Sequence, residues 1–200
     1  MRVVSWSGLS VKTLHLFGLN PSARMSSLCP SLNSMTTSLK VLTATTGTRT
    51  DCWNTPASVV QDVVRFFPKL GLDPCCNNKH VPNVPANVLF DEQDDGLSQE
   101  WDYQTVFMNH PYSQSRLWIP YAIEQYKKYE LELLLLIKLD VSTKWWQHVA
   151  HYPWLAYNRR LRFGDGKSAA PFQSAMIYLG SDVNRFIDIF SKDGTIYHSL

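Results

Sequence analysis

The segment 130–139, with the sequence ELELLLLIKL, constrains the fold of this chain more than any other stretch. It is the most apolar run in the sequence, but it is far too short to cross a bilayer. A short, almost continuous apolar run is typical of a strand that other elements cover on both faces. We therefore predict a central strand here, inside a sheet that carries helices on each side.

Strand and helix patterns alternate along the chain from about residue 49. Residues 55–67 favour a helix, with Thr55 as its N-cap, Pro56 at its first position and Pro68 after its end. A second helix is predicted to start near Pro120. The remaining predicted elements are a helix over 143–152 and strands over 70–73, 87–90, 105–109, 160–163 and 174–180. This alternation predicts an α/β fold, a mostly parallel sheet with an antiparallel edge strand and helices on both faces.

Residues 1–50 differ in composition from the rest of the chain, because they contain five basic residues, 17 Ser or Thr and no Asp or Glu. Such a composition is typical of a mitochondrial transit peptide. Alternatively, translation starts at Met25 or Met35, and the residues before it are upstream sequence. The segment also lacks the periodicity of a packed element. We expect residues 1–48 to be a disordered extension or an upstream-start artefact, and residues 49–200 to form a single domain.

Charge and motif content exclude several classes of protein. Residues 51–200 carry 14 basic and 17 acidic residues, so any nucleic-acid contact must come from a local patch. The patterns G-x-x-x-x-G-K-[ST], G-x-G-x-x-G and H-E-x-x-H are absent. No C-x-x-C pair occurs, which favours reduced thiols over a zinc site built from Cys52, Cys75, Cys76 and His80. We expect neither a bound metal nor a membrane segment.

Polar residues at the predicted strand ends mark the candidate site. Asp73 and Asn109 each end a strand, and ligands of such sheets bind at the carboxyl ends of the strands. The amide of Asn109 can donate to and accept from a flat heterocycle, and the ring of Tyr112 can stack on the same group. The alternative is an ordinary loop in which Asn109 caps a turn and Asp73 forms one.

A basic segment, YNRRLRFGDGK, occupies residues 157–167. Its cations alternate with aromatic residues in an otherwise acidic domain. They are Arg159, Arg160, Arg162 and Lys167. Such a mixture suits phosphate contact combined with base stacking, and a solvated surface face is the alternative.

Taken together, these motifs resemble those of phage-type DNA N6-adenine methyltransferases. The resemblance rests on the order of WNTP at 53–56, LDPC at 72–75, DGL at 95–97 with Trp101, NHPYS at 109–113 and APFQSA at 170–175. It runs from about Asp51 to the C-terminus, roughly three quarters of the chain. It implies that residues 49–200 are a single methyltransferase domain of a virus- or prophage-encoded enzyme. Such an enzyme would use S-adenosylmethionine and act on double-stranded DNA. We also expect the protein to be a monomer and to work in the cytoplasm.

The resemblance also implies a role for each motif. Asn109 and the carbonyl of His110 would hold the target amine, Pro111 would shape the turn, and Tyr112 would stack on a flipped adenine. The residues implied for the cofactor site are Trp53, Thr55, Pro56, Asp73, Cys75 and Asp95. The residues predicted to contact DNA are Ser113 of the NHPYS motif and the four cations of the basic segment, Arg159, Arg160, Arg162 and Lys167.

His110 is a departure from the family, which usually has proline at this position. The carbonyl of histidine can accept the same hydrogen bond, but histidine leaves φ free and adds an N–H. Two alternatives to adenine methylation remain. One is an N4-cytosine methyltransferase, because the same amine chemistry serves both bases, and the other is an inactive DNA-binding protein of the same fold.

Overall fold

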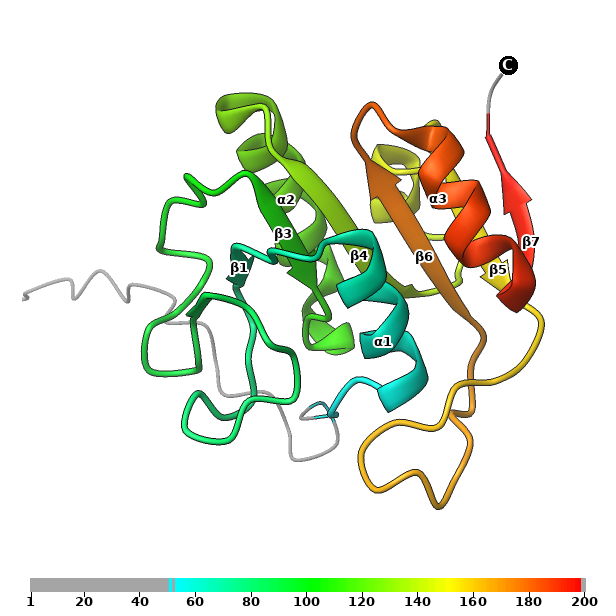
Figure 1. Ribbon diagram of the computed structural model, residues 1–200, viewed down its shortest axis with the longest axis horizontal. Coiled ribbons are helices and arrows are strands. Elements are labelled where there is room, and N and C mark those ends of the chain that lie inside the picture. Colours follow the sequence, from blue (N-terminus) through cyan, green and yellow to red (C-terminus); the bar gives the residue numbers. More distant parts are fainter. Residues whose placement is uncertain (1–50, 52, 199–200) are drawn as a thin grey trace, which may run out of the picture. The chain divides into compact units, whose positions relative to one another are not determined.

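The computed structural model describes residue 51 and residues 53–198, and Figure 1 shows the fold. The extension predicted over residues 1–48 lies outside the described residues. The strands are β1 (Leu72–Asp73), β2 (Val88–Leu89), β3 (Thr105–Met108), β4 (Glu132–Lys138), β5 (Trp154–Tyr157), β6 (Ser174–Leu179) and β7 (Gly194–Tyr197). The helices are α1 (Ala57–Phe66), α2 (Ser115–Tyr129) and α3 (Val183–Phe190), with short 3-10 helices η1 (Tyr112–Gln114), η2 (Lys144–His148) and η3 (Ser191–Asp193).

The described strands form one mixed sheet in the order β2-β1-β3-β4-β6-β5-β7. The neighbours from β2 to β4 pair in parallel, and the pairings from β4 to β7 are antiparallel. The predicted α/β fold with a mixed sheet is therefore confirmed, and its antiparallel part extends over three pairings. Because β1 and β3 are parallel neighbours, their carboxyl ends lie side by side at one end of the sheet.

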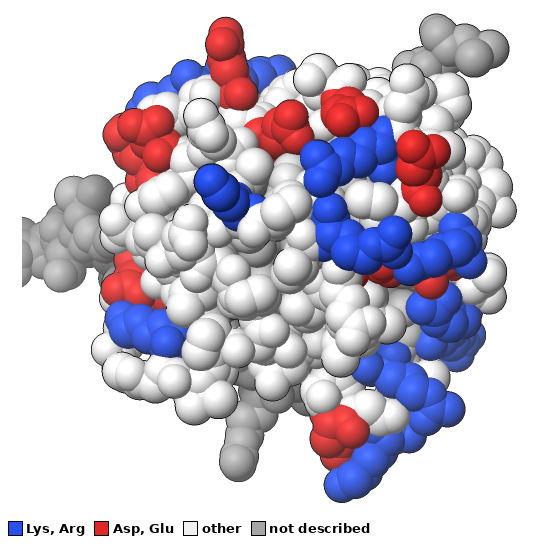
Figure 2. Space-filling model, viewed as in Figure 1, with Lys and Arg blue, Asp and Glu red and all other residues white. Residues whose placement is uncertain are grey.

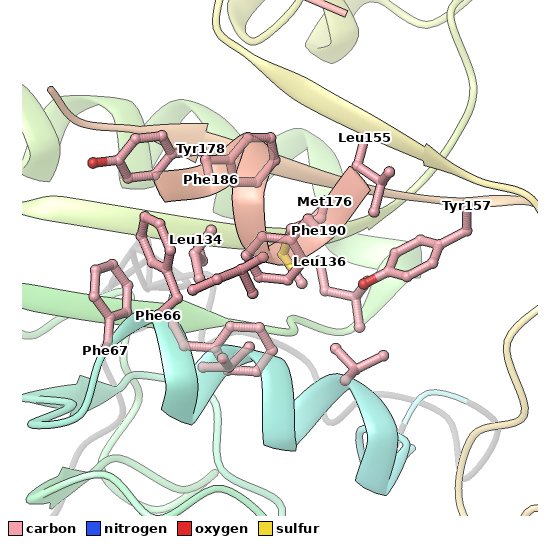
Figure 3. Packing of buried hydrophobic residues seen from close by; sticks show 14 of the residues in the cluster. Phe66, Phe67, Leu134, Leu136, Leu155, Tyr157, Met176, Tyr178, Phe186 and Phe190 are labelled. Carbon is pink, nitrogen blue, oxygen red and sulfur yellow. The ribbon is translucent and has the colours of Figure 1, made fainter. Parts of the chain in front are cut away.

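The apolar run 130–139 forms the central strand β4, as predicted, and its side chains divide the interior into two cores. Leu134 and Leu136 pack with residues of α1 and α3 on one face of the sheet, and Figure 3 shows this core. Leu133, Leu135 and Ile137 pack with α2 and η2 on the other face. This separation follows from the two-residue period of a strand, which points successive side chains to opposite faces.

Helix α1 forms where its valine spacing predicts it, and its buried residues include Val59, Val63 and Phe66. The predicted N-cap is wrong. Pro56 is the N-cap residue, and no side chain of residue 51 or residues 53–198 caps this end of the helix. The hydroxyl of Thr55 instead accepts a hydrogen bond from the side chain of Asn109 at 3.0 Å. The Thr55 side chain therefore binds the residue that follows β3 and does not cap the helix.

Helix α2 starts at Ser115, five residues before the predicted start at Pro120, which lies inside the helix. The prediction treated proline as a first-turn residue, but η1 continues directly into α2 and begins the helical turn earlier. Pro120 lacks the N–H that would bond to the carbonyl of Arg116. Arg116 is exposed, so water can satisfy that carbonyl.

The strand predicted over 160–163 is wrong, because that segment is a loop and the strand β5 lies earlier, at Trp154–Tyr157. The strand β6 is paired on both sides, with β4 and with β5, so residues 160–163 cannot pair with it. The alternation of Leu161 and Phe163 reflects their burial in the core that includes Leu134 and Leu136.

The helix predicted over 143–152 is a short 3-10 helix. No helix of the described residues is long and apolar enough to cross a membrane.

Candidate active site

Asn109 follows the last residue of β3, and its side-chain amide has a fixed orientation. Its nitrogen Nδ2 donates to the hydroxyl of Thr55 at 3.0 Å and to the carbonyl of Trp53 at 3.3 Å. A backbone carbonyl can only accept, so the nitrogen must face this side. The amide oxygen Oδ1 therefore points away from Trp53 and Thr55, as an acceptor at the end of the sheet.

Asp73 ends the neighbouring strand β1 and is 5% exposed. One of its oxygens, Oδ1, accepts a hydrogen bond from the backbone N–H of Cys75 at 3.1 Å. Burial raises the pKa of this carboxyl to about 7, against the lowering effect of the bond from Cys75. In the free protein the carboxyl thus changes charge near neutral pH.

A pocket of about 260 Å³, part of it open solvent, lies between these strand ends. Five of the predicted site residues line it. They are Trp53, Thr55, Asp73, Cys75 and Asn109. The other lining residues were not predicted, and they are Asn54, Cys76, Asn77, Asn83 and Val84. For Asn77 and Asn83, the only signal in the sequence is the recurrence of asparagine in the loop 77–87, which by itself indicates no more than turns.

Asp95 and Pro56 were predicted for the cofactor site, but neither lines the pocket. The loop that carries Asp95 nevertheless packs closely against the loop after β1. A Cβ atom on Gly96 would lie 2.0 Å from the carbonyl oxygen of Pro74, and the indole N–H of Trp101 donates to the Gly96 carbonyl at 2.9 Å. These contacts place Asp95 beside the Asp73 loop without making it part of the pocket wall.

His110 is buried, with 2% of its surface exposed. Its ring nitrogen Nε2 lies 2.9 Å from the hydroxyl of Ser115. Burial lowers the pKa of the imidazole to about 3. His110 is therefore neutral at physiological pH, and its charge takes no part in the site.

Tyr112, two residues further along, is held among aromatic rings. Its ring packs edge to face against Phe172 at 5.3 Å and Phe163 at 6.0 Å between centroids. Its buried hydroxyl has no hydrogen-bond partner among the described residues, and burial raises its pKa. Phe172 comes from the APFQSA motif, whose role sequence reasoning left open.

The basic segment 157–167 adjoins the pocket. The N–H of Gly164 donates to the carbonyl of Asn54 at 2.9 Å, and Phe163 contacts the ring of Trp53 at 6.2 Å. Figure 2 shows Lys and Arg side chains gathered at the lower right, over the loop that follows β5. Arg159 forms an ion pair with Asp193 at 2.7 Å.

The remaining predicted DNA contacts differ in their surroundings. Arg160 and Lys167 are exposed, and Ser113 is exposed in the turn of the Asn109 motif. Arg162 donates to the carbonyl of Lys167 at 2.8 Å, which closes residues 162–167 of the basic segment into a loop. Within residues 51 and 53–198, no group of three or more His, Cys, Asp or Glu side chains is arranged to hold a metal ion.

A parallel half-sheet whose strand-end acid faces a strand-end Asn-His-Pro-Tyr turn gives this chain a fold like that of S-adenosylmethionine-dependent methyltransferases. The family model described as DNA N-6-adenine-methyltransferase (Dam) matches residues 42–186. The chain belongs to this family.

A curated relative agrees with the family assignment. The DNA N-6-adenine-methyltransferase of Haemophilus phage HP1 (strain HP1c1) is 32% identical over 96 residues, which is 48% of this chain and 54% of the phage protein. The match thus spans about half the length of that relative. No solved structure matches the chain significantly.

Proposed function

We propose that this domain transfers a methyl group from S-adenosylmethionine to the exocyclic N6 amine of adenine in double-stranded DNA. The proposal is carried by the orientation of Asn109, whose Nδ2 is engaged by Trp53 and Thr55 and whose Oδ1 is directed away from them. A carboxamide held in this way presents an acceptor to an amine. Membership of the DNA N-6-adenine-methyltransferase family supports the proposal.

The chemistry required of the site is activation of a poor nucleophile. The lone pair of the adenine amine is delocalised into the ring. Acceptance of its two hydrogens by Asn109 Oδ1 and by the carbonyl of His110 would localise electron density on nitrogen and favour a tetrahedral geometry. The bound cofactor would supply the methyl group, its thioether would leave with the electron pair of the carbon–sulfur bond, and the methylated amine would release one proton to water. Catalysis by this chain is positioning and electrostatics, because Asn109 is fixed before the substrate arrives.

The pocket residues fit the cofactor that the family implies. S-adenosylmethionine supplies a methyl group on a sulfonium whose leaving group is a neutral thioether. Asp73 is a buried carboxyl with a pKa of about 7, and a cationic ligand would convert it to the carboxylate. Asn54, Asn77 and Asn83 supply neutral amide donors and acceptors along the same wall, which suit the polar ends of such a molecule.

The DNA side of the site is assigned to two groups of residues. Tyr112 would stack on a base turned out of the duplex, which offsets part of the unstacking free energy of a few kcal/mol. Ser113, Arg159, Arg160, Arg162 and Lys167 would contact the backbone. The hydrogen bond from Gly164 to Asn54 supports this assignment, because it ties the basic loop to a segment of the pocket wall.

The test is a methylation assay on unmethylated mixed-sequence duplex DNA with a labelled methyl donor, followed by digestion to nucleosides. We expect label on N6 of adenine, and we expect Asn109→Ala to lose at least about a hundredfold in rate, as for the loss of one preorganised polar group at a reaction centre. The matched control is Asn184→Ala on the exposed surface of α3, which should retain full activity. Label on cytosine would show an N4-cytosine methyltransferase, and failure to bind S-adenosylmethionine in calorimetry would refute the enzyme proposal.

A further inference from the structure

Two side-chain hydrogen bonds join the ends of the turn that carries Tyr112. Nε2 of His110 lies 2.9 Å from Oγ of Ser115, and that hydroxyl donates to the carbonyl of Tyr112 at 2.8 Å. A serine hydroxyl has one hydrogen, and here it is directed to a carbonyl that can only accept. Nε2 of His110 must therefore carry the proton and donate to Ser115. The chain of donors runs from His110 through Ser115 to Tyr112.

This chain of donors links two rigid elements. His110 comes two residues after the end of β3, and Ser115 is the first residue of α2. The side chains thus close a six-residue segment, 110–115, across its backbone. Ser115 is 3% exposed and His110 is 2% exposed, so water does not compete for these hydrogen bonds.

The imidazole of His110 also contacts the rings on either side of it. Its centroid lies 5.5 Å from that of Tyr112 and 6.4 Å from that of Trp118 in α2. Tyr112 is consequently held at its carbonyl, through Ser115, and at its ring, by His110. The other ring nitrogen, Nδ1, is buried and has no hydrogen-bond partner in the described part of the chain. The contacts of the ring are thus packing and the hydrogen bond that it donates to Ser115.

We propose that His110 and Ser115 are positioning residues that fix the backbone carbonyl of His110 and the ring of Tyr112 for the target base. This proposal rests on the proposed function. A histidine at this point of the turn leaves φ free, unlike proline, and the hydrogen bonds to Ser115 and Tyr112 supply the restraint from the side chains. The side chain of His110 is buried against Ser115, Tyr112 and Trp118, so its proposed effect on the rate passes through Tyr112 and the turn.

A double-mutant cycle tests the coupling. We expect His110→Ala and Ser115→Ala each to lower kcat by roughly fivefold to tenfold, the effect of one lost buried hydrogen bond, and to leave the Kd for S-adenosylmethionine within about twofold. Because the two residues act as one unit, the double variant should be no slower than the slower single variant. His110→Gln, which keeps a donor of similar reach, should recover most of the rate. Ser181→Ala, at an exposed position before α3, is the matched control and should leave kcat unchanged.

A second readout reports the target base directly. In DNA with 2-aminopurine at the methylated position, the fluorescence rise on binding should be smaller for Ser115→Ala than for the wild-type protein, because a mobile Tyr112 holds a smaller fraction of the base outside the duplex stack. Additive losses in the cycle, no rescue by His110→Gln, or an unchanged fluorescence signal would each overturn the positioning proposal while the wild-type activity stands. A wild-type protein that fails to methylate adenine would overturn the proposed function, and the positioning proposal with it.

Discussion

Replacement of Asp73 by asparagine should stabilise the free protein at alkaline pH while it impairs cofactor binding. The pKa of this carboxyl is raised from 3.8 to about 7, mainly by burial. Since one pKa unit corresponds to about 1.36 kcal/mol, ionisation of Asp73 in the folded protein costs about 4 kcal/mol above pH 7. The asparagine side chain of the variant keeps the shape and the acceptor for the Cys75 N–H, and it has no charge to bury.

The sign of the pH dependence follows from the proton count. Between about pH 4 and pH 7 the carboxyl is ionised in the unfolded chain but protonated in the folded one, so the folded state binds the extra proton. The stability of the wild-type protein therefore falls as the pH rises through this window. The variant lacks this contribution. The difference in unfolding free energy between the two should be about 2 kcal/mol at pH 5 and about 4 kcal/mol at pH 8.5.

Urea unfolding of both proteins at pH 5 and pH 8.5, without cofactor, measures this difference. The wild-type protein and the variant must be compared at each pH, because His110 changes the stability with pH in the direction opposite to Asp73. Its pKa is lowered to about 3, so it destabilises both proteins alike as the pH falls below about 6.5. Any constant effect of the new amide also cancels between the two pH values. A difference that is the same at pH 5 and pH 8.5 would refute the assignment of a raised pKa to Asp73.

Cofactor binding gives the functional half of the prediction. In the wild-type protein, S-adenosylmethionine should bind more tightly as the pH rises from 5 to 7, because binding of a cation favours the carboxylate. Calorimetry at pH 6, in buffers of different ionisation enthalpy, should show release of a proton on binding. The Asp73→Asn variant should bind weakly at every pH and release no proton. Proton release by the variant would assign the linked group elsewhere.

Two further predictions concern the loops around the pocket. Arg160→Ala combined with Arg162→Ala should lower the slope of log Kd for DNA against log salt by about 2. The control, Lys127→Ala combined with Lys144→Ala, changes residues that are exposed on the α2 and η2 side of the sheet and should leave the slope unchanged. Equal slopes in all proteins would show that the basic segment does not contact DNA. Gly96→Ala should lower the melting temperature and weaken cofactor binding. The new Cβ would lie 2.0 Å from the Pro74 carbonyl oxygen and would force the loop that carries Gly96 away from the loop after β1. Unchanged thermal unfolding and cofactor affinity would contradict this close contact.

The parts of the fold that the sequence predicted well are those in which a local pattern and the tertiary environment agree. The apolar run 130–139 needs cover on both faces, and β4 receives it from α1 and α3 on one side and α2 on the other. Asp73 and Asn109 lie together because parallel neighbours end at the same edge of a sheet. Neither inference depends on how the loops fold.

The parts that the sequence did not predict depend on pairing and loop geometry. The alternation of Leu161 and Phe163 has the period of a strand, but it is also the pattern of a loop that places two side chains in a core. Only the pairing of β6 with β4 and β5 decides between them. Similarly, Asn54, Asn77 and Asn83 meet at the pocket through loop geometry, and no local pattern in the sequence encodes that meeting.

The error at Thr55 is of another kind, because a sound local rule failed there. A threonine before Pro56 is a good N-cap, and the absence of a cap typically costs about 1 kcal/mol. Thr55 does not provide this stabilisation, since its hydroxyl accepts from Asn109 Nδ2 and no side chain in the described residues caps α1. Together with the carbonyl of Trp53, this contact sets which atom of the Asn109 amide faces outward. Departures from local preference are expected where a side chain is recruited to a functional site. In the proposed mechanism, the outward oxygen of Asn109 accepts a hydrogen bond from the target amine. The Thr55 hydroxyl, which binds Asn109 Nδ2 and does not cap α1, sets the direction of that oxygen.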